Sequence, residues 1–329
     1  MNQRLLALLL TIPLAACKGS ASPAGSTSRV LEFPALDAAA GAEVLDVCQS
    51  VTLGNDEPIF VNAVEMAAGP AWHHSNWFYV PDTKFDGPDG TWTCSSRNFD
   101  EVAAGGAGGV LFAQSTQSTG ETQQFPAGAA IRIPPHSRVV GGLHLVNAST
   151  SGVHTAITLT LDLIPESQVA VRLKALALEY YRLDIPAHAR SRFTGHCDSQ
   201  GGVPFDFSIY YILPHYHRFG TGMTLAADGP AGFAPIFENS AGVGEAWGRT
   251  LDPPMDVRGQ TRLDFSCGFN NTTDAPLSWG NAGGEMCVLL AWTDSPAVWA
   301  GGVFQTNAVV GTDGNGVILN EGPCGVGGI

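Results

Sequence analysis

The chain has 329 residues, of which 44% are hydrophobic and 14% charged, so it can bury a large core and is not globally disordered. Its formal net charge of −14 argues against nucleic acid as a partner, because no surplus of Lys or Arg is present to displace counterions from phosphates. The 40 glycines and 21 prolines favour turns and short strands over long helices.

The first residues resemble a bacterial export signal. Arg4 is followed by the apolar stretch Leu5–Leu14, which is too short to span a bilayer, and then by Leu14-Ala15-Ala16-Cys17, which resembles a lipobox. We therefore expect residues 1–17 to be a lipoprotein signal with Cys17 as the lipidation site, although an ordinary cleaved signal stays open. Lys18 is not the aspartate that retains such proteins at the inner membrane. The expected location is a bacterial cell envelope, with a lipid anchor in the outer membrane.

After this signal, residues 18–30 are predicted to form a flexible tether, because residues 18–28 are rich in Ser, Gly, Pro and Ala. Ile157–Leu163 alternates strictly between apolar and polar residues and predicts a half-buried strand. Val171–Leu178 alternates less strictly and is compatible with a short helix, but its flanking prolines favour a strand. Phe205–Ile209 alternates again and runs into Tyr210–Leu213.

Turn-forming clusters separate these strands at Asp86–Gly90 and at Ala103–Gly109. No stretch has sustained helical periodicity. The predicted fold class is all-β, with two antiparallel β-sandwich (jelly-roll-like) domains at residues 31–166 and 167–329.

Six cysteines follow Cys17. They are Cys48, Cys94, Cys197, Cys267, Cys287 and Cys324. An even number in an oxidising compartment indicates disulfides, and the absence of a Cys-x-x-Cys pattern weakens zinc and thiol-redox alternatives. Six cysteines allow 15 pairings, so the residues alone leave the pairing open.

Two histidine pairs are candidate metal ligands. In His215-Tyr216-His217, a continuing strand would project both imidazoles to one face. The adjacent His73 and His74 need a bulge or a strand end to share a metal. Met286, beside Cys287, offers a thioether that suits Cu(I). The simpler interpretation is that these are metal-free surface or core histidines and that Met286 fills the core.

Taken together, these residues resemble the copper type II, ascorbate-dependent monooxygenases, the family of peptidylglycine α-hydroxylating and dopamine β-monooxygenases. That family has a His-His pair and a later His for one copper, then His-x-His and a distant Met for a second copper. The matching residues, in order, are His73, His74, His144, His215, His217 and Met286. The resemblance covers roughly Val44 to Cys324 and implies two separate copper sites. His136 is a rival for His144, but His144 lies in the apolar stretch that matches the family.

The resemblance also implies roles and disulfide pairs. The first copper would store an electron, whereas His215, His217 and Met286 would form the catalytic site that binds O2. The reductant would be ascorbate or another one-electron donor. The implied disulfides are Cys48–Cys94, Cys197–Cys324 and Cys267–Cys287. His154, His188 and His196 match no ligand position and are expected to be surface or structural residues.

One departure from the family bears on the substrate. Amidating members bind a peptide carboxylate with polar residues where this chain has Leu213, Val288 and Leu290. Ser75 also replaces a usual Met. We therefore expect a copper-dependent monooxygenase that hydroxylates an aliphatic C–H bond of a small organic molecule and does not amidate peptides. The alternatives are a non-catalytic copper-binding envelope lipoprotein and a plain β-sandwich surface protein.

Overall fold

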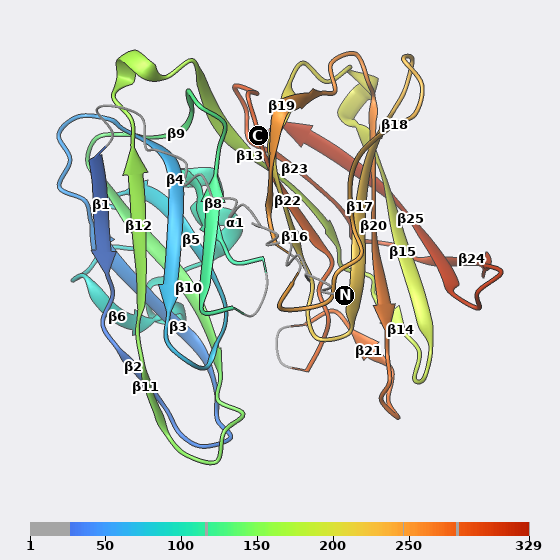
Figure 1. Ribbon diagram of the computed structural model, residues 1–329, viewed down its shortest axis with the longest axis horizontal. Helices are drawn as coiled ribbons and strands as arrows, with labels where there is room; N and C mark the ends of the chain where they lie inside the picture. Colours follow the sequence, from blue (N-terminus) through green and yellow to red (C-terminus); the bar gives the residue numbers. More distant parts are fainter. Residues whose placement is uncertain (1–26, 116–117, 246, 281–282, 329) are drawn as a thin grey trace, which may run out of the picture.

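The computed structural model describes residues 27–115, 118–245, 247–280 and 283–328, which form two β-rich lobes side by side (Figure 1). The predicted all-β class is confirmed. The signal at residues 1–17, Cys17 and tether residues 18–26 lie outside the described residues. The tether prediction is wrong for residues 27–30, because this segment is already part of strand β1, which pairs with β12.

The first lobe is a sandwich of two sheets. One sheet has the order β1-β12-β4-β9 with β8 beside β4, and the other has the order β6-β3-β10-β5-β7. A small pair, β2 and β11, lies apart from both sheets. The strands are β1 (Thr27–Glu32), β2 (Leu36–Ala38), β3 (Glu43–Thr52), β4 (Ile59–Ala68), β5 (Trp72–Pro81), β6 (Gly90–Thr93), β7 (Gly109–Ala113), β8 (Gly120–Gln124), β9 (Ala129–Ile133), β10 (Ser137–Val146), β11 (Val153–Thr155) and β12 (Ile157–Leu163).

The second lobe has one long sheet with the order β19-β16-β22-β13-β23-β25-β15-β20-β17-β18. Strand β24 also pairs with β25, and β14 and β21 form a small separate pair. The two halves of the long sheet face each other, since Ile209 and Leu289 share a core with Phe193 and Phe265. The strands are β13 (Val171–Tyr180), β14 (Asp184–Ile185), β15 (Arg190–Ser199), β16 (Ser208–His215), β17 (Gly220–Asp228), β18 (Ala234–Asn239), β19 (Arg249–Asp256), β20 (Arg262–Asn270), β21 (Leu277–Ser278), β22 (Val288–Thr293), β23 (Trp299–Val303), β24 (Ala308–Thr312) and β25 (Ile318–Gly328).

Strand β13 joins the two lobes. Its first residues pair with β9 of the first lobe, and its later residues pair with β22 and β23 of the second. The pairings with β9 and β23, and that of β15 with β25, are parallel, whereas the other ladders are antiparallel. The expected division into domains at residues 166 and 167 falls in the short 3-10 helix Glu166–Gln168. The division into two domains stays a prediction, because β13 hydrogen-bonds to strands of both lobes.

The predicted strands are largely found, with one shift. Ile157–Leu163 is strand β12 as predicted, and Val171–Leu178 lies within β13. The strand predicted from Phe205 begins only at Ser208. Phe205 and Phe207 are buried in the second core, but their backbone groups bond to the loop at residues 257–260, so no strand forms there.

The glycine-rich cluster Ala103–Gly109 was expected to be a turn, and this prediction is wrong. Residues Glu101–Ala107 form helix α1, in which the Asp100 carboxylate accepts a hydrogen bond from the Ala103 N–H at 2.8 Å. This N-cap satisfies a backbone donor that the helix would otherwise leave open. Ala104 packs against Phe78, so contact with the sheet offsets the low helix propensity of the glycines. The other described helices are the 3-10 segments Cys94–Arg97, Glu166–Gln168 and Gln200–Gly202.

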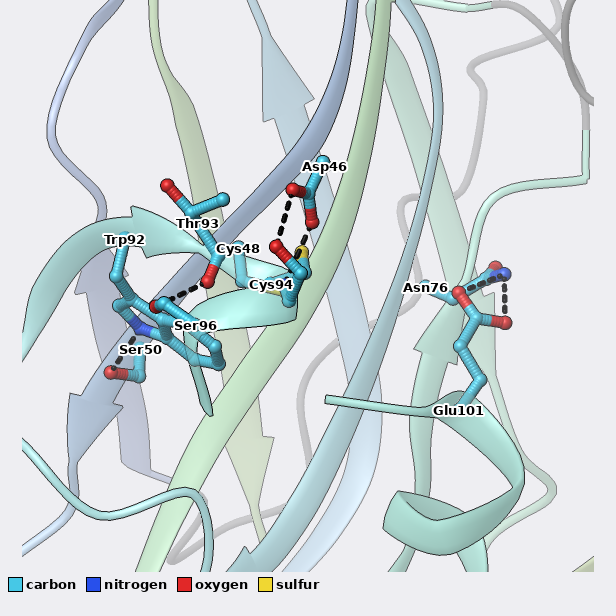
Figure 2. The surroundings of a disulfide bond; sticks show 10 residues. Asp46, Cys48, Ser50, Asn76, Trp92, Thr93, Cys94, Ser96 and Glu101 are labelled. Carbon is cyan, nitrogen blue, oxygen red and sulfur yellow. Dashed lines mark hydrogen bonds between the residues drawn. A yellow bond between two sulfur atoms is a disulfide. The ribbon is translucent and has the colours of Figure 1, made fainter. Parts of the chain in front are cut away.

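All three disulfides occur in the pairing that the resemblance implies. They are Cys48–Cys94, Cys197–Cys324 and Cys267–Cys287. Cys48–Cys94 ties β3 to the 3-10 segment that follows β6 (Figure 2). Beside it, Trp92 Nε1–H donates to Ser50 Oγ at 3.1 Å, and Asp46 accepts from the Ser95 N–H at 2.8 Å. Each disulfide restricts the unfolded chain and stabilises the fold by roughly 2–5 kcal/mol.

Candidate metal centre

The five histidines named as ligands meet at one place, between the two lobes. We call His73, His74, His144, His215 and His217 the histidine cluster. The ring centroids lie 4.6 Å apart for His73 and His144, 5.0 Å for His73 and His217, and 5.2 Å for His74 and His215. The five histidines therefore form one group of side chains, and not the two separate sites that the resemblance implies. The rings of the two sets intermingle, because the start of β5 and the end of β10 lie against the end of β16.

A bulge in the first lobe brings the adjacent histidines together, as predicted for His73 and His74. His74 pairs with His144 on β10, whereas Trp72 pairs with Leu145, so His73 is an extra residue in β5. Strand β3 is also irregular opposite His144, where Asp46 has a positive φ of 57°. The bulge turns neighbouring side chains that would otherwise point to opposite faces toward the same centre.

In the second lobe a strand end places His215 and His217. Strand β16 ends at His215, so His217 lies beyond the strand and not two residues along it as expected. The two rings are nevertheless 5.3 Å apart. A turn follows, in which the Gly220 N–H donates to His217 O at 3.0 Å. The buried carboxylate of Glu285 fixes this turn by accepting from the backbone N–H groups of His217 at 3.0 Å and Phe219 at 2.7 Å.

Backbone carbonyls determine which ring nitrogen is available in the second lobe. His215 Nδ1 lies 3.0 Å from Gln114 O, and His217 Nδ1 lies 3.1 Å from Gly284 O. A carbonyl oxygen only accepts, so Nδ1 carries the proton in both rings and Nε2 holds the lone pair. His217 Nε2 is buried and has no hydrogen-bond partner among the described residues. Such a nitrogen suits a metal ion.

The reverse arrangement holds for His144. Its Nε2 lies 2.6 Å from Glu43 Oε1, so Nε2 donates to the carboxylate and Nδ1 holds the lone pair. His144 Nδ1 lies 3.2 Å from His74 Nε2. Two nitrogens bound to one metal at about 2.0 Å are separated by roughly 3 Å, so this spacing already fits two neighbouring ligands.

The electrostatics favour neutral rings for four histidines of the cluster. Burial, with the neighbouring His217 and His144, lowers the pKa of His73 to about 3. Burial, followed by the effect of His217, lowers the pKa of His215 to about 3. Burial also lowers the pKa of His74 and His217. Neutral imidazoles keep their lone pairs, and buried lone pairs without a donor are costly unless a cation binds them.

Met286 lies on the same structural support as His217. Its backbone N–H also donates to the Glu285 carboxylate, and the next residue, Cys287, is joined to Cys267. The side chain of Met286 is half-buried. Its role as a ligand stays a prediction.

The other histidines lie outside the cluster. His136 is in an exposed turn before β10 with a φ of 55°, so the cluster contains His144 and not its rival. His154 pairs with Asp37 and His188 with Asp274 on the surface, each at 2.8 Å. His196 pairs with Asp264 at 2.8 Å. The expectation that these three are surface or structural residues is confirmed.

The sequence did not reveal the groups that orient the rings. Glu43 is 101 residues from His144, and Gln114 acts through its backbone carbonyl, which no side-chain pattern reports. For Glu285 the sequence offered one signal, namely an acidic residue directly before the candidate ligand Met286. Burial raises the pKa of the Glu285 carboxyl to about 7, while three backbone N–H groups oppose the shift.

Comparisons with known proteins add little. No protein-family model matches the chain, and no curated protein matches it. The major capsid protein of bacteriophage PM2 is similar over 82% of this chain and 97% of its own, at 6% identity and a TM-score of 0.29. N-glycanase F is similar over 82% of this chain and 96% of its own, at 8% identity and a TM-score of 0.28. The exported protein XepA is similar over 80% and 86%, at 8% identity and a TM-score of 0.21. These scores carry no argument about function.

Proposed function

We propose that this protein is a copper-dependent monooxygenase that hydroxylates an aliphatic C–H bond of a small organic substrate. The observation that carries the proposal is the convergence of five histidines, four of them with pKa values lowered by burial, on one centre between two β-lobes. The three disulfides, in the pairing that the resemblance implies, support it independently.

The donor set fits copper. Two copper ions would be held by six residues, His73, His74, His144, His215, His217 and Met286, since imidazole and thioether ligands suit copper and no carboxylate is among them. Copper would supply one-electron transfer and dioxygen activation. The overall reaction is R–H + O2 + 2e⁻ + 2H⁺ → R–OH + H2O, with ascorbate or another one-electron donor as the reductant.

The protein's own groups orient the ligands and limit the substrate. Gln114 O, Gly284 O and the Glu43 carboxylate hold the non-ligating ring protons, which leaves the other nitrogens to face the centre. On the neighbouring strands, Leu213 pairs with Leu290 and His215 pairs with Val288. An anionic substrate group would be poorly solvated against these apolar side chains, which supports the proposal that peptides are not amidated.

The proposed location is the bacterial cell envelope, with a lipid on Cys17 holding the protein at the outer membrane. Within the described ranges, no helix is long and apolar enough to cross a membrane. Metabolic labelling with a fatty acid tests the anchor, and Cys17→Ala should abolish the label.

The test of the enzymatic proposal is the variant Met286→Ile. We expect near two coppers per chain in the unmodified protein and oxygen uptake that needs both reductant and substrate. Met286→Ile should slow oxygen uptake at least tenfold, because it removes the thioether, while the histidines still bind copper. Met255→Ile on β19 is the control and should have no effect. Oxygen uptake that is unchanged by Met286→Ile would contradict the role given to Met286.

A non-catalytic copper-binding lipoprotein is the second candidate. It is favoured by the burial of the cluster, since His74, His144, His215 and His217 are each at most 8% exposed. This candidate predicts copper binding without substrate-dependent oxygen uptake, and a panel of substrates separates the two functions.

A further inference from the structure

The arrangement of the histidine cluster bears on which residues share a metal. The donor atoms of His73, His74 and His217 all lie within 4.8 Å of one another. His73 and His74 belong to the bulge of β5 in the first lobe, and His217 belongs to the turn after β16 in the second lobe. The trio therefore spans both lobes.

Two further observations favour His217 as a partner of His73 and His74. Its Nε2 is a buried nitrogen without a hydrogen-bond partner among the described residues, and its ring lies 5.0 Å from that of His73 and 5.5 Å from that of His74. His144 is not part of this trio, and its Nε2 is engaged by Glu43 at 2.6 Å. The lone pair of His217 is thus the more available third ligand.

We propose that His73, His74 and His217 bind one metal ion together, so that the first ion to bind joins the two lobes. This inference rests on the proposed metal-binding function but not on turnover. Drawing the three nitrogens from within 4.8 Å to the roughly 3.3 Å of a tetrahedral site needs movements of about 1 Å, which side-chain rotation can supply. The affinity of the first-lobe pair then depends on a residue of the second lobe.

Zinc is the probe, because it binds imidazole and has no redox chemistry. Competition with a chromophoric chelator measures the affinity of the first equivalent. We expect His217→Ala to weaken it at least 100-fold and His144→Ala to weaken it by less than tenfold. His196→Ala, in the same lobe but paired with Asp264 outside the cluster, is the matched control and should have no effect. The opposite order, with His144→Ala severe and His217→Ala mild, would overturn the inference.

If His217→Ala fails to fold, zinc binding can be followed in the unmodified protein instead. Histidine-ring nitrogen NMR should show that the first zinc equivalent shifts His73, His74 and His217. A shift of His73, His74 and His144 alone would overturn the proposal and leave the monooxygenase function intact. Zinc binding by the bridging trio with no copper-dependent oxygen uptake would overturn the function and leave the inference intact. If neither metal binds, both are wrong.

Discussion

At the scale of single residues, the histidine cluster is shaped by groups that lie outside it. Three of the five imidazoles give their single N–H to an oxygen outside the cluster, and that bond decides which nitrogen is available. Two of these oxygens belong to the backbone. The histidines of the cluster could be predicted from sequence, but their ring orientation could not, because it depends on atoms that a residue pattern does not reveal.

Glu43 provides the clearest test at this scale. Removing its carboxylate in Glu43→Ala should lower the affinity for the second equivalent of zinc or Cu(I) by roughly 10–100-fold, because His144 loses the bond that fixes its ring, and should leave the first equivalent nearly unchanged. A chelator competition measures the change. Asp37→Ala is the matched control, since it breaks a carboxylate–histidine pair with His154 on the surface. Equal affinities in the two variants would show that Glu43 does not position His144.

At the scale of elements, the alternating patterns predicted β12 and β13 well, and the adjacent His73 and His74 correctly indicated a bulge. The start of β16 was missed because burial of Phe205 and Phe207 imitates a strand even where the backbone bonds to a loop. Helix α1 was missed because its glycines look like a turn, although the Asp100 cap and the contact of Ala104 with Phe78 stabilise it.

Strand β10, which carries His144, depends on close packing at Gly141. A methyl group there would lie 2.5 Å from the ring of Trp77, which is fully buried and bonded to Ser75 Oγ. We expect Gly141→Ala to lower the free energy of unfolding by about 1–3 kcal/mol, because the ring or the strand must shift. Urea denaturation measures this. The added methyl group of Gly325→Ala in β25 would have no atom within 4 Å, so the stability of this control variant should be nearly unchanged. Unchanged stability of Gly141→Ala would show that the core around Trp77 accommodates the extra methyl group.

At the scale of the whole molecule, packing between the lobes decides whether the histidines form one centre or two. Phe125 of the first lobe contacts Tyr211 and Trp292 of the second, with ring centroids 5.8 and 5.9 Å apart. This junction brings β16 against β5 and β10. The sequence predicted the clustered histidines lobe by lobe, but the relative placement of two lobes depends on contacts between distant residues, which no local pattern reports.

Glu121 near this junction predicts a pH dependence of stability. It is 5% exposed, and burial raises its pKa from 4.5 to about 7, although Ser115 opposes the shift. The folded protein holds this proton more tightly than the unfolded chain, so stability falls as pH rises from about 4.5 to 7. Relative to Glu121→Gln, the unmodified protein should lose about 3 kcal/mol over that range. Chemical denaturation at several pH values measures it.

The exposed Glu65, on the neighbouring strand β4, provides the control for this experiment. Glu65→Gln removes a carboxylate without altering a buried site, so its stability should follow that of the unmodified protein at every pH. If Glu121→Gln also followed the unmodified protein, the Glu121 carboxyl would not be the source of the effect.

The sharing of β13 has a consequence for attempts to separate the lobes. A fragment ending near residue 168 would remove the partner of β9 and leave an open sheet edge, and the complementary fragment would begin with a strand whose first residues had lost their neighbour. The unpaired backbone N–H and C=O groups of an open sheet edge can pair with strands of other chains. Each half expressed alone should therefore aggregate, and co-expression of the two halves should restore soluble protein.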